Sequence, residues 1–261
     1  MNGFLQTIAA DKVVEIASAR ARISELDLRA SVRDLPPCRG FAEALSGQGT
    51  RIIAEVKRRS PSVPAFLQQG APVLLAQLYA NAGATALSLV TDSSRFGTSI
   101  EDIAPMRAGT SLPLIAKDFV IDPYQILALR ASGADAVLLI ARLLDDSRLD
   151  EFLNQARELD LDVLVECHDE ADIRNALAAG ARLVGINNRD LDSFIVSMDT
   201  SRSLLPLIPD TCLKVVESGL RGREEITELQ SHGADAFLIG GSLLQSPDPA
   251  GHLHELLGRT V

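Results

Sequence analysis

The sequence predicts an α/β fold, a single (β/α)8 TIM barrel in which eight parallel strands alternate with helices. Four segments share one pattern, in which a Gly-Ala step at 83–84, 133–134, 180–181 or 233–234 precedes an apolar strand. Four further apolar runs lie between these segments, so that interleaving gives eight strands. The chain has 261 residues, and such barrels usually need about 250 residues. We therefore predict one barrel domain over residues 1–261.

Residues 1–45 precede the first predicted strand. Residues 7–30 have apolar side chains at helical spacing, and the proline pair at 36–37 ends this pattern. We interpret residues 1–45 as a helical N-terminal extension that packs on the barrel and is not a separate domain.

The eight predicted strands are short and almost continuously apolar, which is typical of a parallel sheet covered by helices. They begin near Ile52, Ala86, Leu114, Ala136, Val163, Leu183, Lys214 and Ala236. The glycine of each repeat suits a helix C-terminus, where a positive φ is easiest for glycine. Helix-like stretches at 72–83, 122–133 and 148–160 separate the strands. The alternative is an open doubly wound sheet, but residues 55–64 lack its Gly-rich dinucleotide turn.

Composition excludes several classes of function. The net charge of −10 argues against a nucleic acid partner, because phosphate backbones need a basic surface. Cys38, Cys167 and Cys212 are too few and too widely spaced for a disulfide framework, which favours a reducing, cytoplasmic compartment. No signal peptide or membrane-length apolar run is apparent, and the four histidines form no ligand set, so we expect no membrane association and no metal.

Charged and polar side chains gather where the predicted strands end. They are Glu55, Lys57, Lys117, Asp118, Glu166, Asn187, Asn188, Arg189, Glu217 and Ser218. In a (β/α)8 barrel these ends form the active-site mouth. Each residue alone could be a structural ion pair, a loop anchor or a helix cap. An unpaired buried ion costs several kcal/mol, so their coincidence at one rim indicates a functional site.

Glycines at the last two strands predict a phosphate site. Gly219 follows the seventh strand, and Gly240, Gly241 and Ser242 follow the eighth. Barrels often bind phosphate with these two loops, because glycine lets backbone N–H groups approach the oxygens. The expected ligand is therefore a small phosphorylated molecule.

Seven motifs in this order resemble the indole-3-glycerol phosphate synthase family of tryptophan biosynthesis. They are IIAEVKRRSPS, PLIAKDFVIDPYQI, GADAVLLIARLL, DVLVECHDEADI, GINNRDL, VVESGL and ADAFLIGGSLL. The resemblance spans nearly the whole chain. It implies a barrel without a cofactor that converts 1-(2-carboxyphenylamino)-1-deoxyribulose 5-phosphate to indole-3-glycerol phosphate, releasing CO₂ and water. It also implies a cytoplasmic monomer that can associate with other tryptophan-pathway enzymes.

The resemblance assigns the catalytic roles. Lys117 is the general acid that protonates the ribulose carbonyl oxygen, and Glu166 handles protons during dehydration. Lys57 holds the anthranilate carboxylate, with Glu55 orienting it, and either Lys57 or Glu166 supplies the dehydration proton. We expect burial to lower the pKa of Lys117 and make it a better acid.

The resemblance also assigns substrate contacts. The substrate-binding residues are Asn187, Arg189, Glu217, Ser218 and Phe96, and the phosphate-binding residues are Ser60, Gly219, Gly240 and Gly241.

Two departures from the family pattern leave alternatives open. Val63-Pro64-Ala65 stands where the family usually has a flexible glycine loop, so we expect a stiffer lid. Gly241 stands where serine or glutamate is more usual, which keeps the backbone donors. A paralogue with an altered substrate or turnover, or a non-catalytic phosphate-binding barrel, are the alternatives to an active synthase.

Overall fold

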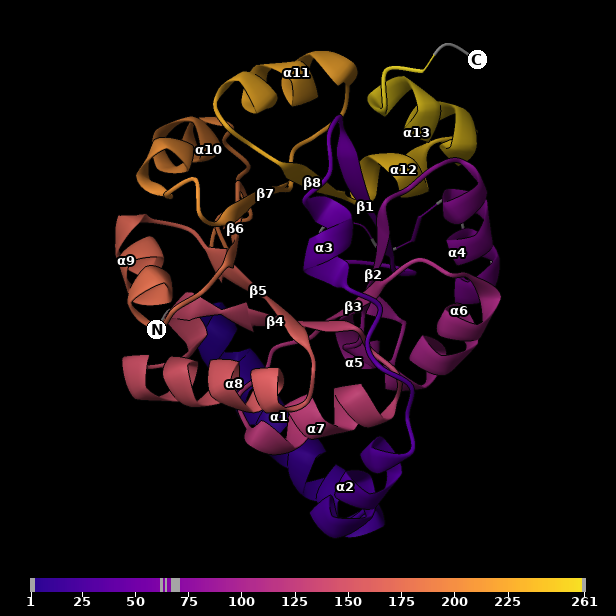
Figure 1. Ribbon diagram of the computed structural model, residues 1–261, viewed down its shortest axis with the longest axis vertical. Coiled ribbons are helices and arrows are strands. Elements are labelled where there is room, and N and C mark those ends of the chain that lie inside the picture. Colours follow the sequence, from indigo (N-terminus) through magenta and orange to yellow (C-terminus); the bar gives the residue numbers. More distant parts are fainter. Residues whose placement is uncertain (1–2, 62, 64, 67–70, 260–261) are drawn as a thin grey trace.

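The computed structural model describes residues 3–61, 63, 65–66 and 71–259. Eight parallel strands close into a barrel in sequence order, with β8 paired to β1 (Figure 1). The strands are β1 (Arg51–Val56), β2 (Ala86–Val90), β3 (Leu114–Lys117), β4 (Ala136–Ile140), β5 (Asp162–Cys167), β6 (Leu183–Asn187), β7 (Leu213–Glu217) and β8 (Ala236–Ile239). Each begins within one residue of its predicted start, and the closed barrel excludes the doubly wound alternative.

Helices surround the barrel (Figure 1). The main ones are α4 (Pro72–Asn81), α6 (Ile103–Gly109), α7 (Pro123–Ala131), α8 (Asp146–Glu158), α9 (Glu170–Ala178), α10 (Asp199–Leu204), α11 (Arg223–Ser231) and α13 (Pro249–Leu256). Shorter segments lie in the loops: α5 (Ser93–Phe96), η1 (Ile100–Asp102), η2 (Ala141–Leu143), η3 (Leu205–Leu207) and α12 (Gly241–Gln245). The predicted helices at 72–83, 122–133 and 148–160 correspond to α4, α7 and α8.

The repeated glycine turn sets where four of the strands begin. Gly83, Gly133, Gly180 and Gly233 have φ of 91°, 98°, 81° and 96°. Each lies two residues after a helix and three before a strand. An L-side chain is strained at these angles, so glycine here ends the helix and returns the chain to the sheet.

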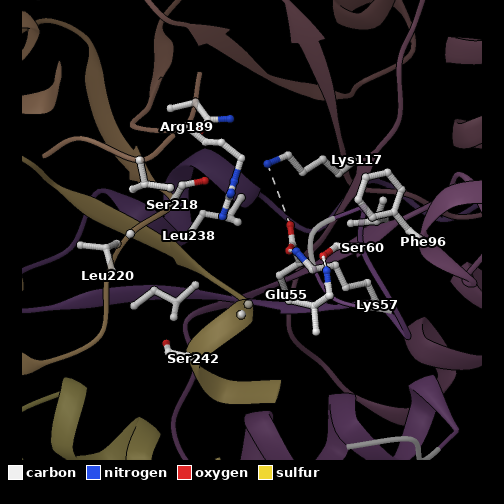
Figure 2. Close-up of a pocket in the computed structure, with 18 of the residues that line it drawn as sticks. Glu55, Lys57, Ser60, Phe96, Lys117, Arg189, Ser218, Leu220, Leu238 and Ser242 are labelled. Atoms are coloured by element: carbon white, nitrogen blue, oxygen red, sulfur yellow. Dashed lines mark hydrogen bonds and ion pairs between the residues drawn. The ribbon is translucent and has the colours of Figure 1, made fainter. Parts of the chain in front are cut away.

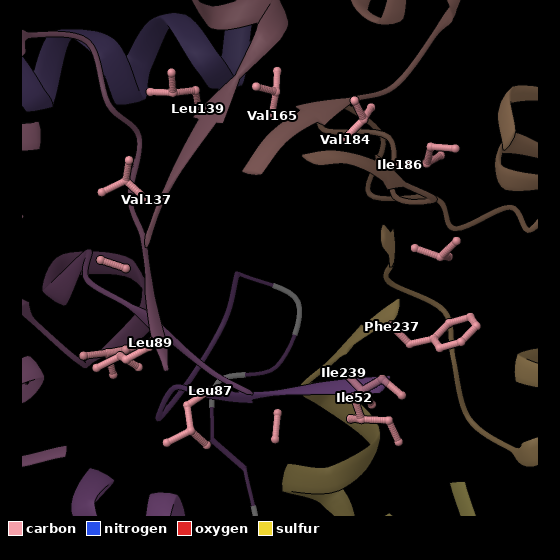
Figure 3. Packing of buried hydrophobic residues seen from close by; sticks show 14 of the residues in the cluster. Ile52, Leu87, Leu89, Val137, Leu139, Val165, Val184, Ile186, Phe237 and Ile239 are labelled. Carbon is pink, nitrogen blue, oxygen red and sulfur yellow. The ribbon is translucent and has the colours of Figure 1, made fainter. Parts of the chain in front are cut away.

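Two apolar layers follow from the alternation of side chains along each strand. On β1, Ile52 and Val56 pack toward the helices, whereas Ile53 packs inside the barrel. Figure 3 shows members of the outer layer from several strands, among them Leu87, Val137 and Ile186. Since Ile53, Glu55 and Lys57 are two residues apart, they share the inner face. This alternation aims the first two predicted catalytic side chains into the barrel mouth.

The N-terminal extension contains α1 (Gly3–Arg22), α2 (Glu25–Arg33) and α3 (Phe41–Leu45). The backbone N–H groups of Arg39 and Ala42 donate to Asp135 and Asp162, beside or at the amino ends of β4 and β5, at 2.8 Å each. Phe41 and Leu45 are buried in the interior cluster, so α3 closes the amino end of the barrel. At the opposite end, the N-terminal part of α1 reaches the mouth, where Phe4 lines the cavity.

Candidate active site

A cavity of about 900 Å³ occupies the carboxyl end of the barrel. Figure 2 shows Glu55, Lys57, Lys117 and Phe96 at one side of it, with Leu220 and Ser242 farther along. Of the residues that the family resemblance assigns, all except Glu217 line it: Glu55, Lys57, Ser60, Phe96, Lys117, Glu166, Asn187, Arg189, Ser218, Gly219, Gly240 and Gly241. The structure therefore brings ammonium and carboxylate groups from separate strands to one pocket.

Lys117, the last residue of β3, is surrounded by three buried carboxylates. Its Nζ lies 2.5 Å from Glu217 Oε2, 3.4 Å from Glu166 Oε2 and 3.9 Å from Glu55 Oε2. These carboxylates come from β7, β5 and β1, so four strands define the position of one ammonium group. Glu217 is fully buried behind Lys117, which explains why it does not line the cavity.

The expectation that burial gives Lys117 a lowered pKa is wrong. Burial does lower the pKa of Lys117, but the charges of Glu217, Glu166 and Glu55 outweigh it, and the pKa lies above its ordinary value. For Glu217, burial outweighs the opposite charge of Lys117. Burial, together with the nearby Glu166 and Glu55, raises the pKa of Glu217 to about 7. Lys117 is therefore an ammonium group at neutral pH, and Glu217 is the carboxyl group most ready to take up a proton.

Glu55 and Lys57 form the second charged unit. Lys57 Nζ donates to Glu55 Oε1, so the two residues on one face of β1 are directly bonded. Lys57 Nζ also lies 5.8 Å from the centroid of the Phe66 ring, within cation–π range. Burial raises the pKa of Glu55, but Lys57 and Lys117 outweigh burial and leave it below the ordinary value. A carboxylate is thus ionised between two lysines.

The loops after β6 and β7 are held by polar contacts. Asn187 Oδ1 accepts from the backbone N–H of Arg189 at 3.0 Å, and Arg189 Nη1 donates to the carbonyl of Phe194 at 3.1 Å. Asn188 Nδ2 donates to the carbonyl of Ser218 at 3.1 Å. These bonds fix the direction of Arg189 and join the two loops at the cavity.

On the predicted phosphate side, the loop after β7 has a left-handed backbone conformation. Ser218 and Gly219 both have positive φ, 65° and 86°. After β8, Ser242 Oγ is buried without a hydrogen-bond partner in the part of the chain that the structure describes. It is a free hydroxyl beside Gly240 and Gly241 at the cavity wall. These groups are suited to an oxyanion ligand.

Sequence reasoning missed two parts of the site. The rings of Phe4 and Phe194 meet edge to face with centroids 5.0 Å apart, and both line the cavity. No local pattern predicts that contact. His168 stands behind Glu166, with Nε2 3.3 Å from Glu166 Oε1. The Glu-x-His spacing at the end of β5 was a visible signal, because i and i+2 share a strand face.

The predicted lid falls partly outside the described residues. Ser60 and Val63 form an isolated antiparallel bridge, with the N–H of Ser60 donating to the carbonyl of Val63 at 2.8 Å. Pro64 lies outside the described residues, so the stiffness of the lid stays a prediction. Among the described residues, no group of three or more His, Cys, Asp or Glu is arranged for a metal ion, and no helix has the length and apolarity to cross a membrane.

Comparisons with known proteins point in the same direction as the motifs. The family model described as Indole-3-glycerol phosphate synthase matches residues 5–256. The Indole-3-glycerol phosphate synthase of Nocardioides sp. is 41% identical over 254 residues, covering 97% of this chain and 98% of that protein. That of Aquifex aeolicus is 42% identical over 258 residues, covering 98% of this chain and 99% of that protein.

Solved structures support the architecture. A mutant tryptophan synthase alpha-subunit from Pyrococcus furiosus has a TM-score of 0.61 at 16% identity, covering 80% of this chain and 98% of that one. Thiamine phosphate pyrophosphorylase from Pyrococcus furiosus has a TM-score of 0.59 at 14% identity, covering 80% of this chain and 93% of that one. At such identities the likeness shows the fold alone.

Proposed function

The chain belongs to the indole-3-glycerol phosphate synthase family, and from this premise we propose how the groups around its cavity share the reaction. The activity is that of a carboxy-lyase in tryptophan biosynthesis. It closes a ring in 1-(2-carboxyphenylamino)-1-deoxyribulose 5-phosphate and expels CO₂ and water. Relatives that match nearly the whole chain do not favour the paralogue or the non-catalytic barrel. The observation that carries the proposal is the Lys117 ammonium at the cavity wall, 2.5, 3.4 and 3.9 Å from three carboxylates.

Ring closure is assigned to Lys117. Attack of the aromatic ring on the ribulose carbonyl develops an alkoxide, which a nearby ammonium stabilises and then protonates. A raised pKa makes Lys117 a weaker proton donor, but it keeps the group charged when the substrate arrives. Its electrostatic effect on the alkoxide is therefore the larger contribution.

Decarboxylation is assigned to Lys57 and Glu55. Lys57 binds the anthranilate carboxylate, and the hydrogen bond that Lys57 donates to Glu55 fixes the direction of its ammonium group. The negative charge of Glu55 also offsets part of the positive charge of Lys57, which limits how strongly Lys57 binds the substrate carboxylate. Loss of CO₂ needs that balance, because only interactions stronger in the transition state accelerate a step.

Dehydration requires a base and an acid. Burial raises the pKa of Glu166, but Lys117 and His168 outweigh burial, so Glu166 is ionised at neutral pH. An ionised carboxylate has no proton to give, so Glu166 is the base that takes the proton from the ring carbon. Lys57 then supplies the proton that leaves with the hydroxyl group as water.

Binding is assigned to the remaining residues. Phe96 lines the pocket for the aromatic ring, Asn187 and Glu217 contact the intermediate, and Arg189 stands near the rim. Ser218 also binds the substrate, and the phosphate is held by Ser60, Gly219, Gly240 and Gly241. Anchoring the phosphate at one end orders the flexible ribulose against the ring, which lowers the entropy cost of ring closure. Support comes from the cavity that almost all of them line.

The proposal includes the domain organisation, the compartment and the oligomeric state of the protein. We take residues 1–261 as one domain acting as a cytoplasmic monomer that can associate with other tryptophan-pathway enzymes. In support of the compartment, all three cysteines, which lie within the described ranges, are free thiols. The small phosphorylated substrate needs no nucleic acid or cofactor.

The function is tested by following indole fluorescence and released CO₂ together. With the purified full chain and the carboxyphenylamino-deoxyribulose phosphate, we expect equal amounts of both products. Tight binding of the substrate without either product would favour the non-catalytic barrel.

Gly240 offers a test of how Glu55 is held. A Cβ at Gly240 would lie 2.5 Å from Glu55 Oε1 and 2.9 Å from Glu55 Cβ, whereas a Cβ at Gly241 meets nothing within 4 Å. The φ of Gly240 is −129°, outside the left-handed region that favours glycine, so the substitution tests mainly the contact with Glu55. We expect Gly240→Ala to displace Glu55 and lower kcat by about 10²-fold.

Thermal unfolding provides the comparison between the two glycines. Gly240→Ala should lower Tm, and Gly241→Ala should leave Tm unchanged. A Gly240→Ala variant with full kcat and unchanged Tm would contradict the importance of this contact.

A further inference from the structure

We propose that His168 is a positioning residue, which holds the Glu166 carboxylate in place and charged while Lys117 gives up its proton. The inference rests on the roles proposed above for Glu166 and Lys117. None of the roles proposed above involves this histidine.

The geometry places Glu166 between two cations. Glu166 Oε2 lies 3.4 Å from Lys117 Nζ, and Glu166 Oε1 lies 3.3 Å from His168 Nε2. The side chain of His168 is only 4% exposed and does not line the cavity. Each carboxylate oxygen therefore has its own positive partner, one inside the pocket and one behind it.

A second carboxylate holds His168 from the other side. Asp172 Oδ2 accepts from the backbone N–H of His168 at 2.8 Å and lies 3.6 Å from His168 Nδ1. Arg142 of η2 in turn donates to Asp172 Oδ2 from Nε at 3.1 Å. Each ring nitrogen therefore faces a carboxylate at ion-pair distance without a hydrogen bond among the described residues, and the backbone bond to Asp172 holds the residue beside Glu166.

The charges around this pair favour an imidazolium. Burial lowers the pKa of His168, but Asp172 and Glu166 outweigh burial and raise it to about 9. The charged and polar groups that face the pair from neighbouring elements are Glu55, Lys117, Glu217, Asn187, Asp169, Asp172 and Arg142. At neutral pH, His168 is the cation that remains beside Glu166 when Lys117 becomes neutral.

The consequence concerns the step that Glu166 serves. When Lys117 passes its proton to the substrate, Glu166 loses one of its two cations. Without His168, a carboxylate with 2% exposure would take up a proton and could no longer act as the dehydration base. With His168, Glu166 stays ionised through ring closure and decarboxylation.

The experiment uses His168→Gln in the full chain, under single-turnover conditions. At pH 7 we expect CO₂ release to stay within about twofold, and indole formation to slow about tenfold. The acid limb of indole formation should move up by about one pH unit, because the pKa of Glu166 rises when the imidazolium is lost. An unchanged acid limb, or equal slowing of CO₂ and indole, would overturn the proposal.

Asp169→Asn is the matched control. Asp169 contacts Arg142 at 3.0 Å on the exposed side and caps α9 by accepting from the N–H of Asp172, which asparagine can also do. We expect both rates and the acid limb to match those of the unaltered chain. An upward shift of the acid limb equal to that of His168→Gln would overturn the proposal, because loss of an anion should lower the pKa of Glu166 and only loss of a cation should raise it.

A measurement independent of activity guards against misfolding of the variant. NMR titration of the His168 ring in the unaltered protein should show proton loss near pH 9, well above an ordinary histidine. A neutral ring at pH 7 would overturn the proposal. If the unaltered chain formed no indole, the proposed function would fail, and the titration would still report on the charge of His168.

Discussion

Replacing Lys117 by methionine is expected to lower kcat for indole formation by about 10³-fold or more, with KM changed by less than about fivefold. Methionine keeps most of the length of the side chain but removes both the proton and the charge that stabilise the developing alkoxide. Loss of the Lys117 ammonium also leaves Glu217, Glu166 and Glu55 without their common cation. Glu217, with a pKa of about 7 already, should then bind a proton at neutral pH.

Lys214→Met is the matched control for this prediction. Lys214 is a buried strand lysine on β7, but it pairs with Asp210 at 2.8 Å and lies outside the cavity. We expect its kcat to stay within about twofold of the unaltered chain. Steady-state fluorescence of the product measures both variants. Unchanged product formation by Lys117→Met would remove Lys117 from the role of general acid.

Replacing Lys12 by methionine is expected to lower the free energy of unfolding by about 3–5 kcal/mol. Lys12 of α1 is 1% exposed, and its Nζ lies 2.7 Å from Asp118 Oδ1, 3.0 Å from Glu15 Oε2 and 3.7 Å from Asp92 Oδ2. Burial lowers the pKa of Lys12, but Asp118 and Glu15 outweigh burial and leave it raised. Removing the ammonium leaves Asp92 and Asp118 buried with less compensation.

The effect of Lys12 should also reach the active site. Asp118 follows Lys117 directly, and Asp92 caps α5, which carries Phe96. Arg20→Met serves as the control, since Arg20 lies on the same helix and pairs with Asp122 at 2.6 Å, but is 46% exposed. An exposed pair contributes about 1 kcal/mol or less. Urea unfolding should separate the two variants, and equal midpoints would show that the buried ion pairs of Lys12 do not stabilise the fold.

Most of the barrel was predictable because its signals are local. The glycine at a positive φ comes two residues after a helix and three before a strand, so the four repeats place half of the strands. The mouth residues were predictable because a charge at the end of an apolar strand has few structural uses. Local periodicity and strand ends therefore account for the positions of Glu55, Lys57, Lys117 and Glu166.

What the sequence did not reveal depends on distant residues meeting in space. Lys12 reads as an ordinary helix lysine, and only the packed structure shows that it is buried against two strand ends. The direction of the pKa shift of Lys117 needed the positions of three carboxylates from three strands. Phe4 reaches the cavity from the start of the chain, a contact that no spacing rule indicates.

The position of helix α3 has a consequence for substrate entry and product release. Within the described residues, Phe41 and Leu45 block the amino end of the barrel, so the cavity is open at the carboxyl end alone. Carbon dioxide, water and the indole product must all leave through the opening by which the substrate entered. Carbon dioxide and water are small enough to leave first, and the next substrate molecule can bind only after the larger indole product has been released.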